Sequence, residues 1–410
     1  MTDAQRKVRE VFAGTWLSYA GYYLCRKNFS VLMPLLVRDL HFSKDDLAQV
    51  IFFFSLAYAA GQFLTGTLAD RLGAKTVVAV GMVLSAGCTL AMTWGSTLWF
   101  FAAMQLINGL AQSAGWPGLL KITGAWFDPS RRGVLMAWWS TNYVVGGFLA
   151  TIAATWFATG PLAPEWGWKR GAAGPAFLLG LITLVFLVLV KERPSEADPR
   201  ISAGRAWRQV LSSPQIHCIA ASYFCLKLTR YSFLYWLPLY MAERLRYRAA
   251  DAGYSSSVYE LAGFLGAPLA GYISDKWMGG RRFPVGAAML FGLAMGCLVY
   301  SQISLLGVAA NLAAISTIGI LTYGPDTLLS GAATQDAANP EAMATASGYI
   351  NGIGSAGQVV SPFVVAAAVR QVGWDGLFVI FAGAALLGAV ILAARWKMGG
   401  EEPQARLANA

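Results

Sequence analysis

The feature that most constrains this chain is a series of twelve long apolar segments, separated by short charged or Gly/Pro-rich stretches. A helix needs roughly 20 mainly apolar residues to cross a bilayer, and each segment has about that length or more. Only 13% of the residues are charged, whereas soluble domains carry about 25%. The sequence therefore predicts an all-α membrane protein with 12 transmembrane helices. The predicted spans are 12–37, 46–69, 76–94, 98–126, 134–160, 171–190, 215–242, 252–274, 284–303, 305–335, 342–369 and 375–394.

The lysine and arginine residues outside these spans are unevenly divided between the two sides of the membrane. Eighteen lie on the side that holds both termini and eight lie on the other. Because loops rich in Lys and Arg stay in the cytoplasm, we predict a multi-pass protein of a bacterial inner membrane with both termini cytoplasmic. This bias accounts for much of the formal charge of +10, so membrane lipid is an expected partner and nucleic acid is not. The charged N-terminus leads into a segment too long for a signal peptide, and we expect it to be retained.

Cysteine and histidine give no sign of a metal or catalytic centre. The five cysteines lie in or beside predicted spans without metal-ligand spacing, which favours reduced, packed thiols. The two histidines, His41 and His217, are near span ends. We therefore expect no metal, no cofactor and no enzyme activity.

A polar stretch divides the chain into two halves. Residues 191–214 form the only long polar segment in the interior of the sequence. We predict an N-terminal six-helix bundle at 1–190, a cytoplasmic linker at 191–214 and a C-terminal six-helix bundle at 215–410. The segment "GTLADRLGAK" follows the second span, and a degenerate copy, "GYISDKWMGGRR", follows the eighth. A repeat at half the chain length indicates a duplicated bundle.

The repeated segment is a short loop motif with three notable charges. Asp70 and Asp275 are equivalent positions, 205 residues apart, and each can cap or pair at a neighbouring helix end. Arg71 can anchor the loop at the cytoplasmic face. The motif resembles that of the major facilitator superfamily, whose fold is two pseudo-symmetric six-helix bundles around a central cavity. The resemblance implies this fold and says little about the substrate.

Charged residues inside the predicted spans point to an anionic ligand. A charge at the centre of a membrane costs about 2.5 to 3.5 kcal/mol on the insertion scale, so such residues are rarely without a role. The cations outnumber the acids, and the excess positive charge calls for an anion. The cations are Arg26, Lys27, Lys121, Lys227 and Arg230, and the acids are Glu260 and Asp326.

Arg26 and Arg230 are equivalent in the repeat, 204 positions apart at the middle of the first and seventh spans. We expect them to face each other across the cavity, although ion pairs that fix helix packing are the alternative. Arginine stays charged and offers a planar fork of donors that matches phosphate or carboxylate. A phosphate group carries about −1.5 to −2 near neutrality. A phosphoryl group is therefore the leading ligand.

Five segments of the predicted spans form a recognisable set: "YYLCRKNFSVLMPLL", "NGLAQSAGWPGLLK", "LTRYSFLYWLPLY", "YELAG" and "YGPDTLLSG". Together they resemble the organophosphate:phosphate antiporters of the major facilitator superfamily, and the resemblance extends over nearly the whole chain. The resemblance implies that Arg26 and Arg230 hold the phosphate and that a sugar or glycerol phosphate is exchanged for inorganic phosphate by alternating access. The sequence of the fourth span is most similar to the glucose-6-phosphate branch, which includes sugar-phosphate sensors.

Three positions depart from the pattern of that family. Gln62 stands where lysine is frequent, and Tyr143 stands where glycerol-3-phosphate carriers have histidine. Asp326 replaces a residue that is usually apolar. Its carboxylate can pair with a cation, bind sugar hydroxyls or recognise a substrate amine, and the sequence leaves these three roles open.

The remaining candidates surround the arginine pair. Glu260 is expected to balance a buried cation, and Lys27 to pair with an acid or to contact the substrate. Lys227 shares a helix face with Arg230, whereas Lys121 can snorkel toward the membrane surface. The full set of predicted cavity residues is Lys27, Tyr23, Lys227, Tyr231, Lys121, Trp116, Tyr143, Asp326, Tyr349 and Asn351.

We therefore expect a monomeric antiporter that exchanges a phosphorylated small molecule, such as glucose 6-phosphate, for inorganic phosphate. Two alternatives stay open. One is a sugar-phosphate receptor of the same fold that signals with little transport. The other is a proton-coupled symporter, which would need Asp326 or Glu260 as its titratable acid.

Overall fold

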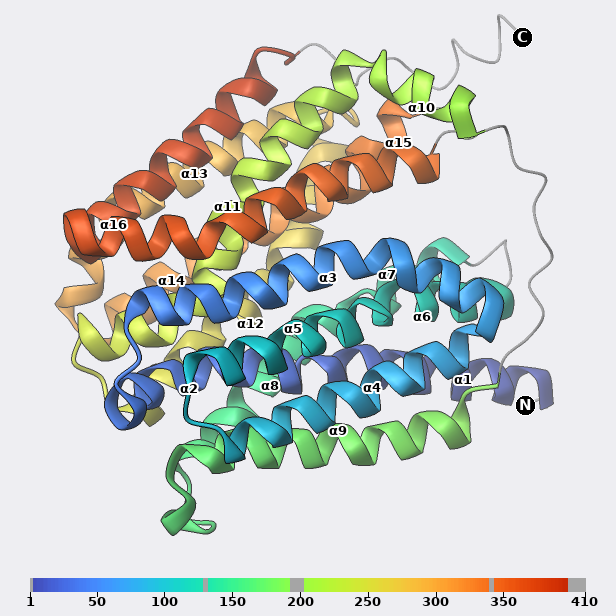
Figure 1. Cartoon of the computed structure of the whole chain (residues 1–410). Helices are drawn as coiled ribbons and strands as arrows, with labels where there is room; N and C mark the ends of the chain where they lie inside the picture. The colour runs from blue at the N-terminus through green and yellow to red at the C-terminus, as the bar shows by residue number, and fades with distance from the viewer. Residues whose placement is uncertain (1–2, 128–131, 192–202, 339–342, 397–410) are drawn as a thin grey trace, which may run out of the picture. The chain divides into compact units, whose positions relative to one another are not determined.

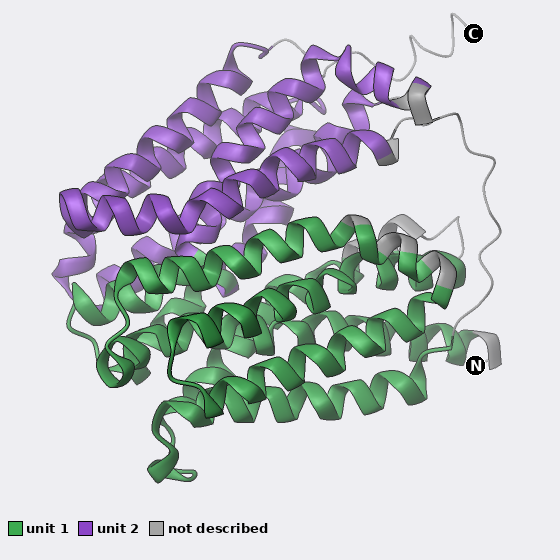
Figure 2. Ribbon diagram, in the orientation of Figure 1, with its two compact units in different colours: residues 1–197, 234–260 green, residues 198–233, 261–410 purple. Residues whose placement is uncertain are grey.

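The computed structural model describes residues 3–127, 132–191, 203–338 and 343–396, and the described residues form helices and short connections only (Figure 1). They fall into two compact units, coloured separately in Figure 2. Unit 1 is Met1–Ala197 with Leu234–Glu260, and unit 2 is Asp198–Phe233 with Leu261–Ala410. The segment Leu234–Glu260 belongs to unit 1 although the residues on either side of it in the sequence belong to unit 2. It consists of the end of α11 (Pro214–Glu243) and the start of α12 (Ala249–Lys276). The predicted division at 191–214 stays a prediction.

Unit 1 is a bundle of long apolar helices. Helices α3 and α5 pack against each other, as do α4 and α9, which lie side by side in Figure 1. The core is apolar and includes the fully buried Trp139 and Tyr22. The elements are α1 Asp3–Tyr22, α2 Leu24–Leu40, α3 Lys44–Leu72, α4 Ala74–Ala91, the short 3-10 helix η1 Met92–Trp94, α5 Leu98–Ser113, α6 Gly115–Trp126, α7 Arg132–Trp139, α8 Thr141–Thr159, the 3-10 segment η2 Pro164–Lys169 and α9 Arg170–Leu189.

Unit 2 is built in the same way. Helix α13 packs against both α14 and α16. Helix α16 is a single run interrupted at Gly373, where φ is 71° and the two halves of the helix meet without a loop. The elements are α10 Ala203–Leu211, α11 Pro214–Glu243, α12 Ala249–Lys276, α13 Arg282–Ile303, the 3-10 turn η3 Ser304–Leu306, α14 Val308–Thr327, the π-helical turn η4 Leu328–Ala332, α15 Ala333–Ala337 and α16 Met343–Ala393.

Helices cover all twelve predicted spans within the described residues. In the part of the chain that the structure describes, five stretches are long and apolar enough by themselves to cross a membrane. Other predicted spans are broken, as at Tyr23 between α1 and α2, or carry the buried cations, as does α11. The five are Ala74–Trp94, Pro164–Leu189, Arg282–Leu306, Val308–Ala337 and Thr345–Ala393.

Two helix interruptions lie beside charged residues singled out from the sequence, and a third lies beside Gln112, a hydrogen-bond partner of Arg26. The break at Tyr23 puts Arg26 in the first turn of α2, and the break at Ala114 follows the last turn of α5. In unit 2, Asp326 lies between Pro325 and the π-helical turn η4. Irregular turns of this kind often accompany functional sites in helices.

The loop motif is only partly described. Asp70 and Arg71 lie near the end of α3, but their side chains are outside the part of the chain that the structure describes. Asp275, at the end of α12, forms an ion pair with Arg282, and Arg282 Nε also lies 3.2 Å from Asp336 Oδ2. Asp275 therefore ties α12 to the start of α13, as a pairing role at a helix end requires.

Candidate functional site

Arg26 is buried in unit 1, with 4% of its surface exposed. Its guanidinium carbon lies 4.8 Å from the ring centre of Tyr23, 4.6 Å from that of Tyr58 and 5.7 Å from that of Phe54. These cation–π contacts stabilise the charge but leave its hydrogen-bonding fork available. Within the described residues, Arg26 forms no ion pair and its Nη2 has no hydrogen-bond partner.

The Nε donor of Arg26 is fixed by an amide network. Nε donates a 2.8 Å hydrogen bond to Gln112 Oε1. The Gln112 amide nitrogen in turn donates to Ser85 Oγ at 3.1 Å and to Asn108 Oδ1 at 3.1 Å, and Asn108 donates to the Cys25 carbonyl at 2.9 Å. This network assigns the orientation of the Gln112 amide. It therefore holds Arg26 by a neutral partner rather than by an acid.

Lys27, the next residue along α2, is committed to other contacts in unit 1. Its Nζ lies 3.5 Å from Glu260 Oε2 and donates a 2.8 Å hydrogen bond to the Leu234 carbonyl. Thr151 Oγ1 also donates to Glu260 Oε2 at 3.2 Å. Lys27 and Glu260 are both buried. Glu260 and Lys27 therefore form a buried ion pair with each other, in which the carboxylate balances the charge of the ammonium group.

Arg230 is buried in unit 2 but differs from Arg26 in its partner. Its Nη1 lies 2.9 Å from Asp326 Oδ1, and the two side chains are 7% and 5% exposed. The guanidinium carbon also lies 4.6 Å from the ring centre of Tyr323 and 5.5 Å from that of Tyr231. Of the three roles left open for Asp326, pairing with a cation is the one that this geometry displays.

Lys227 extends the charged cluster of unit 2. It lies one turn before Arg230 on α11, and its Nζ donates to Asn351 Oδ1 at 3.2 Å and to Ser355 Oγ at 3.4 Å on α16. Its ammonium group interacts electrostatically with both Asp326 and Arg230. Lys227 thus contacts Asn351 and lies one turn from Arg230, and a substrate role for Lys227 and Asn351 stays a prediction.

Each unit therefore carries a buried cluster of two cations and one acid, with a net charge of +1. The cluster of unit 1 is Arg26, Lys27 and Glu260, and that of unit 2 is Lys227, Arg230 and Asp326. Buried charge of this kind is costly unless it is paired.

The contacts of four other predicted site residues are with residues other than the two arginines. Trp116 packs edge-on against Tyr19, at 5.1 Å between ring centres, and Tyr143 packs against the same core. Lys121 Nζ donates to the Ala69 carbonyl at 3.1 Å. Tyr349 Oη lies 3.0 Å from His217 Nδ1. His217 lies on α11, 13 residues or about 20 Å along the helix before Arg230. A substrate role for these four stays a prediction.

Sequence reasoning did not single out Gln112, Tyr58, Tyr323 or Ser355 as site residues. Gln112 and Asn108 are polar residues one helix turn apart inside an apolar span, which is a readable signal of an internal polar face. Tyr58 and Tyr323 give no comparable signal, because aromatic residues are frequent throughout the chain.

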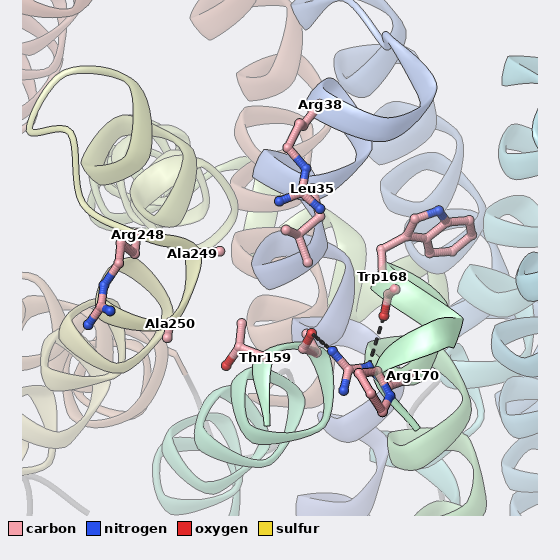
Figure 3. A pocket seen from close by; sticks show the side chains of 11 residues that line it. Leu35, Arg38, Thr159, Trp168, Arg170, Arg248, Ala249 and Ala250 are labelled. Atoms are coloured by element: carbon pink, nitrogen blue, oxygen red, sulfur yellow. Dashed lines mark hydrogen bonds between the residues drawn. The ribbon is translucent and has the colours of Figure 1, made fainter. Parts of the chain in front are cut away.

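A separate pocket lies at the end of α2 in unit 1 (Figure 3). It has a volume of about 400 Å³, and its nearest lining residue on α2, Leu35, lies 9 residues, or about 14 Å, along the helix from Arg26. Arg38 pairs with Asp39, which raises the pKa of the Arg38 guanidinium, and Arg248 pairs with Asp251. Arg170 donates four hydrogen bonds to backbone carbonyls. The pocket contains none of the predicted site residues, and its arginines are already satisfied.

Among the residues with described side chains, no group of three or more His, Cys, Asp or Glu is placed to hold a metal ion.

Comparison with known proteins decides the family. The Major Facilitator Superfamily model matches residues 15–362. The putative glycerol-3-phosphate transporter 2 of Arabidopsis thaliana is 31% identical over 440 residues, which cover 93% of this chain and 85% of that protein. The chain belongs to the organophosphate:phosphate antiporter family of the major facilitator superfamily.

One further relative agrees with this family, and one solved structure agrees with its fold. The glucose-6-phosphate exchanger SLC37A2 of Mus musculus is 28% identical over 457 residues, covering 92% of this chain and 90% of that protein. The crystal structure of the nucleoside transporter NupG has a TM-score of 0.76 at 15% identity, covering 95% of this chain and 99% of that one, and shows the fold alone. The predicted all-α major facilitator fold and family are confirmed. This family member is a multi-pass secondary transporter rather than an enzyme.

Proposed function

We propose that this transporter exchanges a phosphorylated small molecule for inorganic phosphate, with Arg26 and Arg230 as the phosphate ligands. The observation that carries the proposal is Arg26, a buried guanidinium without an acidic partner in the described residues and with Nη2 unpartnered. A buried donor without a partner costs about 1 to 3 kcal/mol, and more when it is charged. An anion that accepts from this fork would remove that cost.

Phosphate suits the site better than a singly charged anion. A phosphate monoester carries about −1.5 to −2 charge and three acceptor oxygens, and each unit offers a buried cluster with a net charge of +1. The relatives named as glycerol-3-phosphate transporter and glucose-6-phosphate exchanger favour a glycerol phosphate or a sugar phosphate as the organic substrate. Both termini in the cytoplasm and a monomeric protein belong to the same proposal.

The proposal is tested with purified protein in phosphate-loaded proteoliposomes. We expect uptake of labelled phosphate by counterflow, inhibited by external glucose 6-phosphate or glycerol 3-phosphate, with the stronger inhibitor indicating the substrate class. Binding of these compounds without any counterflow would favour the receptor alternative. Uptake that needs an imposed pH gradient and no internal phosphate would favour the proton-coupled symporter.

A substitution at Gln112 tests whether the open fork of Arg26 is the phosphate ligand. In the Gln112→Glu variant a carboxylate of nearly the same shape replaces the amide that accepts from Arg26 Nε at 2.8 Å. The new acid would neutralise the guanidinium, and phosphate affinity should fall by about 10- to 100-fold, the range of one charge-assisted hydrogen bond. Isothermal titration with inorganic phosphate measures this change. Gln105→Glu is the comparison: Gln105 lies two turns before Gln112 on the same face of α5 and accepts from Asn108 rather than from Arg26. It adds the same charge further from the guanidinium, and an equal loss there would count against the prediction.

A further inference from the structure

The two arginines of the proposed site are not equivalent. In the described residues the guanidinium of Arg230 forms an ion pair with a carboxylate, that of Asp326, whereas Arg26 does not pair with an acid. We propose that Asp326 is an internal anion that competes with the substrate phosphate for Arg230, lowering the affinity of the site and speeding the release of phosphate. This inference rests on the proposed function, and it assigns a role to the residue that departs from the pattern of the family.

The contact geometry supports direct competition. Asp326 Oδ1 lies 2.9 Å from Arg230 Nη1, the position that a phosphate oxygen would take in a hydrogen bond to the same nitrogen. The pair is almost fully buried, so water does not screen the two charges as it would at a surface. A phosphate that accepts from this same N–H of Arg230 must therefore displace the carboxylate.

The displaced carboxylate would keep a partner. Lys227 interacts electrostatically with Asp326 as well as with Arg230, and it lies one turn before Arg230 on α11. Asp326 can therefore leave the guanidinium without becoming an isolated buried charge, which would cost several kcal/mol. When phosphate departs, the nearby carboxylate returns to Arg230 and prevents rebinding.

The backbone around Asp326 is suited to this movement. Pro325 precedes it and removes one helical hydrogen bond, and the π-helical turn η4 follows from Leu328 to Ala332. Thr327 and Ser330 donate side-chain hydrogen bonds to the carbonyls of Tyr323 and Asp326 in the same stretch. A helix that already departs from regular geometry on both sides of a residue can shift that residue at low cost.

The Asp326→Asn variant tests the proposal. Asparagine keeps the shape but loses the charge, so we expect inorganic phosphate to bind about 10- to 100-fold more tightly, the range of one charge-assisted hydrogen bond. Exchange at saturating phosphate should become slower, because release is delayed. Affinity is measured by isothermal titration in detergent, and turnover by phosphate self-exchange in proteoliposomes. Damage to the fold would weaken binding, so tighter binding with slower turnover is a specific signature.

Two further variants give the comparison its controls. Asp336→Asn removes an acid of unit 2 that pairs with Arg282 instead, and it should leave phosphate affinity unchanged. In an Arg230→Ala background, Asp326→Asn should no longer tighten binding, since the competition acts at that arginine.

The outcomes separate this inference from the proposed function. Unchanged or weaker phosphate binding in Asp326→Asn, with wild-type exchange intact, overturns the competitor role alone. Tightening that persists without Arg230 also overturns it. If wild-type protein neither binds nor exchanges phosphate and Arg26→Lys changes nothing, the proposed function fails and the competitor role fails with it.

Discussion

Proteoliposomes that contain the Arg26→Lys variant are expected to lose phosphate exchange. Lysine keeps the positive charge, but a point charge cannot reproduce the planar fork that binds two phosphate oxygens. Loss of one charge-assisted hydrogen bond, at about 1.5 to 3 kcal/mol, lowers affinity by about 10- to 100-fold, and loss of two lowers it further. Arg230→Lys should have the same direction of effect. The initial rate of labelled phosphate counterflow measures both.

Arg38→Lys provides the control for Arg26→Lys. Arg38 lies on the same helix, about 18 Å further along, and its exposed side chain pairs with Asp39. Its replacement should leave counterflow close to the wild-type rate. Undiminished exchange in Arg26→Lys would remove the basis for the proposed phosphate ligand.

Replacing Glu260 by glutamine is expected to produce the largest loss of stability. The change leaves Lys27 buried without its carboxylate 3.5 Å away. Removing one partner of a buried ion pair lowers the free energy of unfolding by about 3 to 5 kcal/mol. Thermal unfolding in detergent should show a clear fall in midpoint. Replacing Glu243, which lies 3.0 Å from Lys44 with both side chains about one-third exposed, should cost at most about 1 kcal/mol.

A double variant separates the ion pair from simple packing at Glu260. Lys27→Met combined with Glu260→Gln removes both charges, and most of the lost stability should return because no buried charge is left uncompensated. Additive losses from the two changes would show that the residues stabilise the protein independently, contrary to the pairing in the structure.

The membrane spans and the charged residues inside them could be predicted from the sequence, because a long apolar segment has few alternatives to a membrane helix. Arg26 and Arg230 stood out since a charge in such a segment is costly wherever the helix packs. Counting charges also predicted that Lys27 could pair with an acid. The sequence left open which acid it would be, because Lys27 and Glu260 are more than 230 positions apart and meet only through tertiary packing.

The partners of the arginines were the part that sequence reasoning could not supply. Whether Asp326 faces a cation, a sugar hydroxyl or an amine depends on the rotation of α14, and an apolar helix has no amphipathic pattern to fix that rotation. The π-helical turn beside Asp326 alters the rotation further. Tyr58 and Gln112 reach Arg26 for the same reason, through helix orientations that only the packed bundle determines.

The interruption of α16 at Gly373 has a practical consequence for experiments on topology. The two helical halves meet through a single glycine with φ of 71°, a conformation that other residues rarely adopt. An epitope or protease site inserted at Gly373 would interrupt the direct connection between the two halves of α16. The hairpin around η2 is a better position for a reporter, since Glu165 and Trp166 are exposed between α8 and α9. Antibody access to a tag at that hairpin in intact cells would establish which face of the protein lies outside.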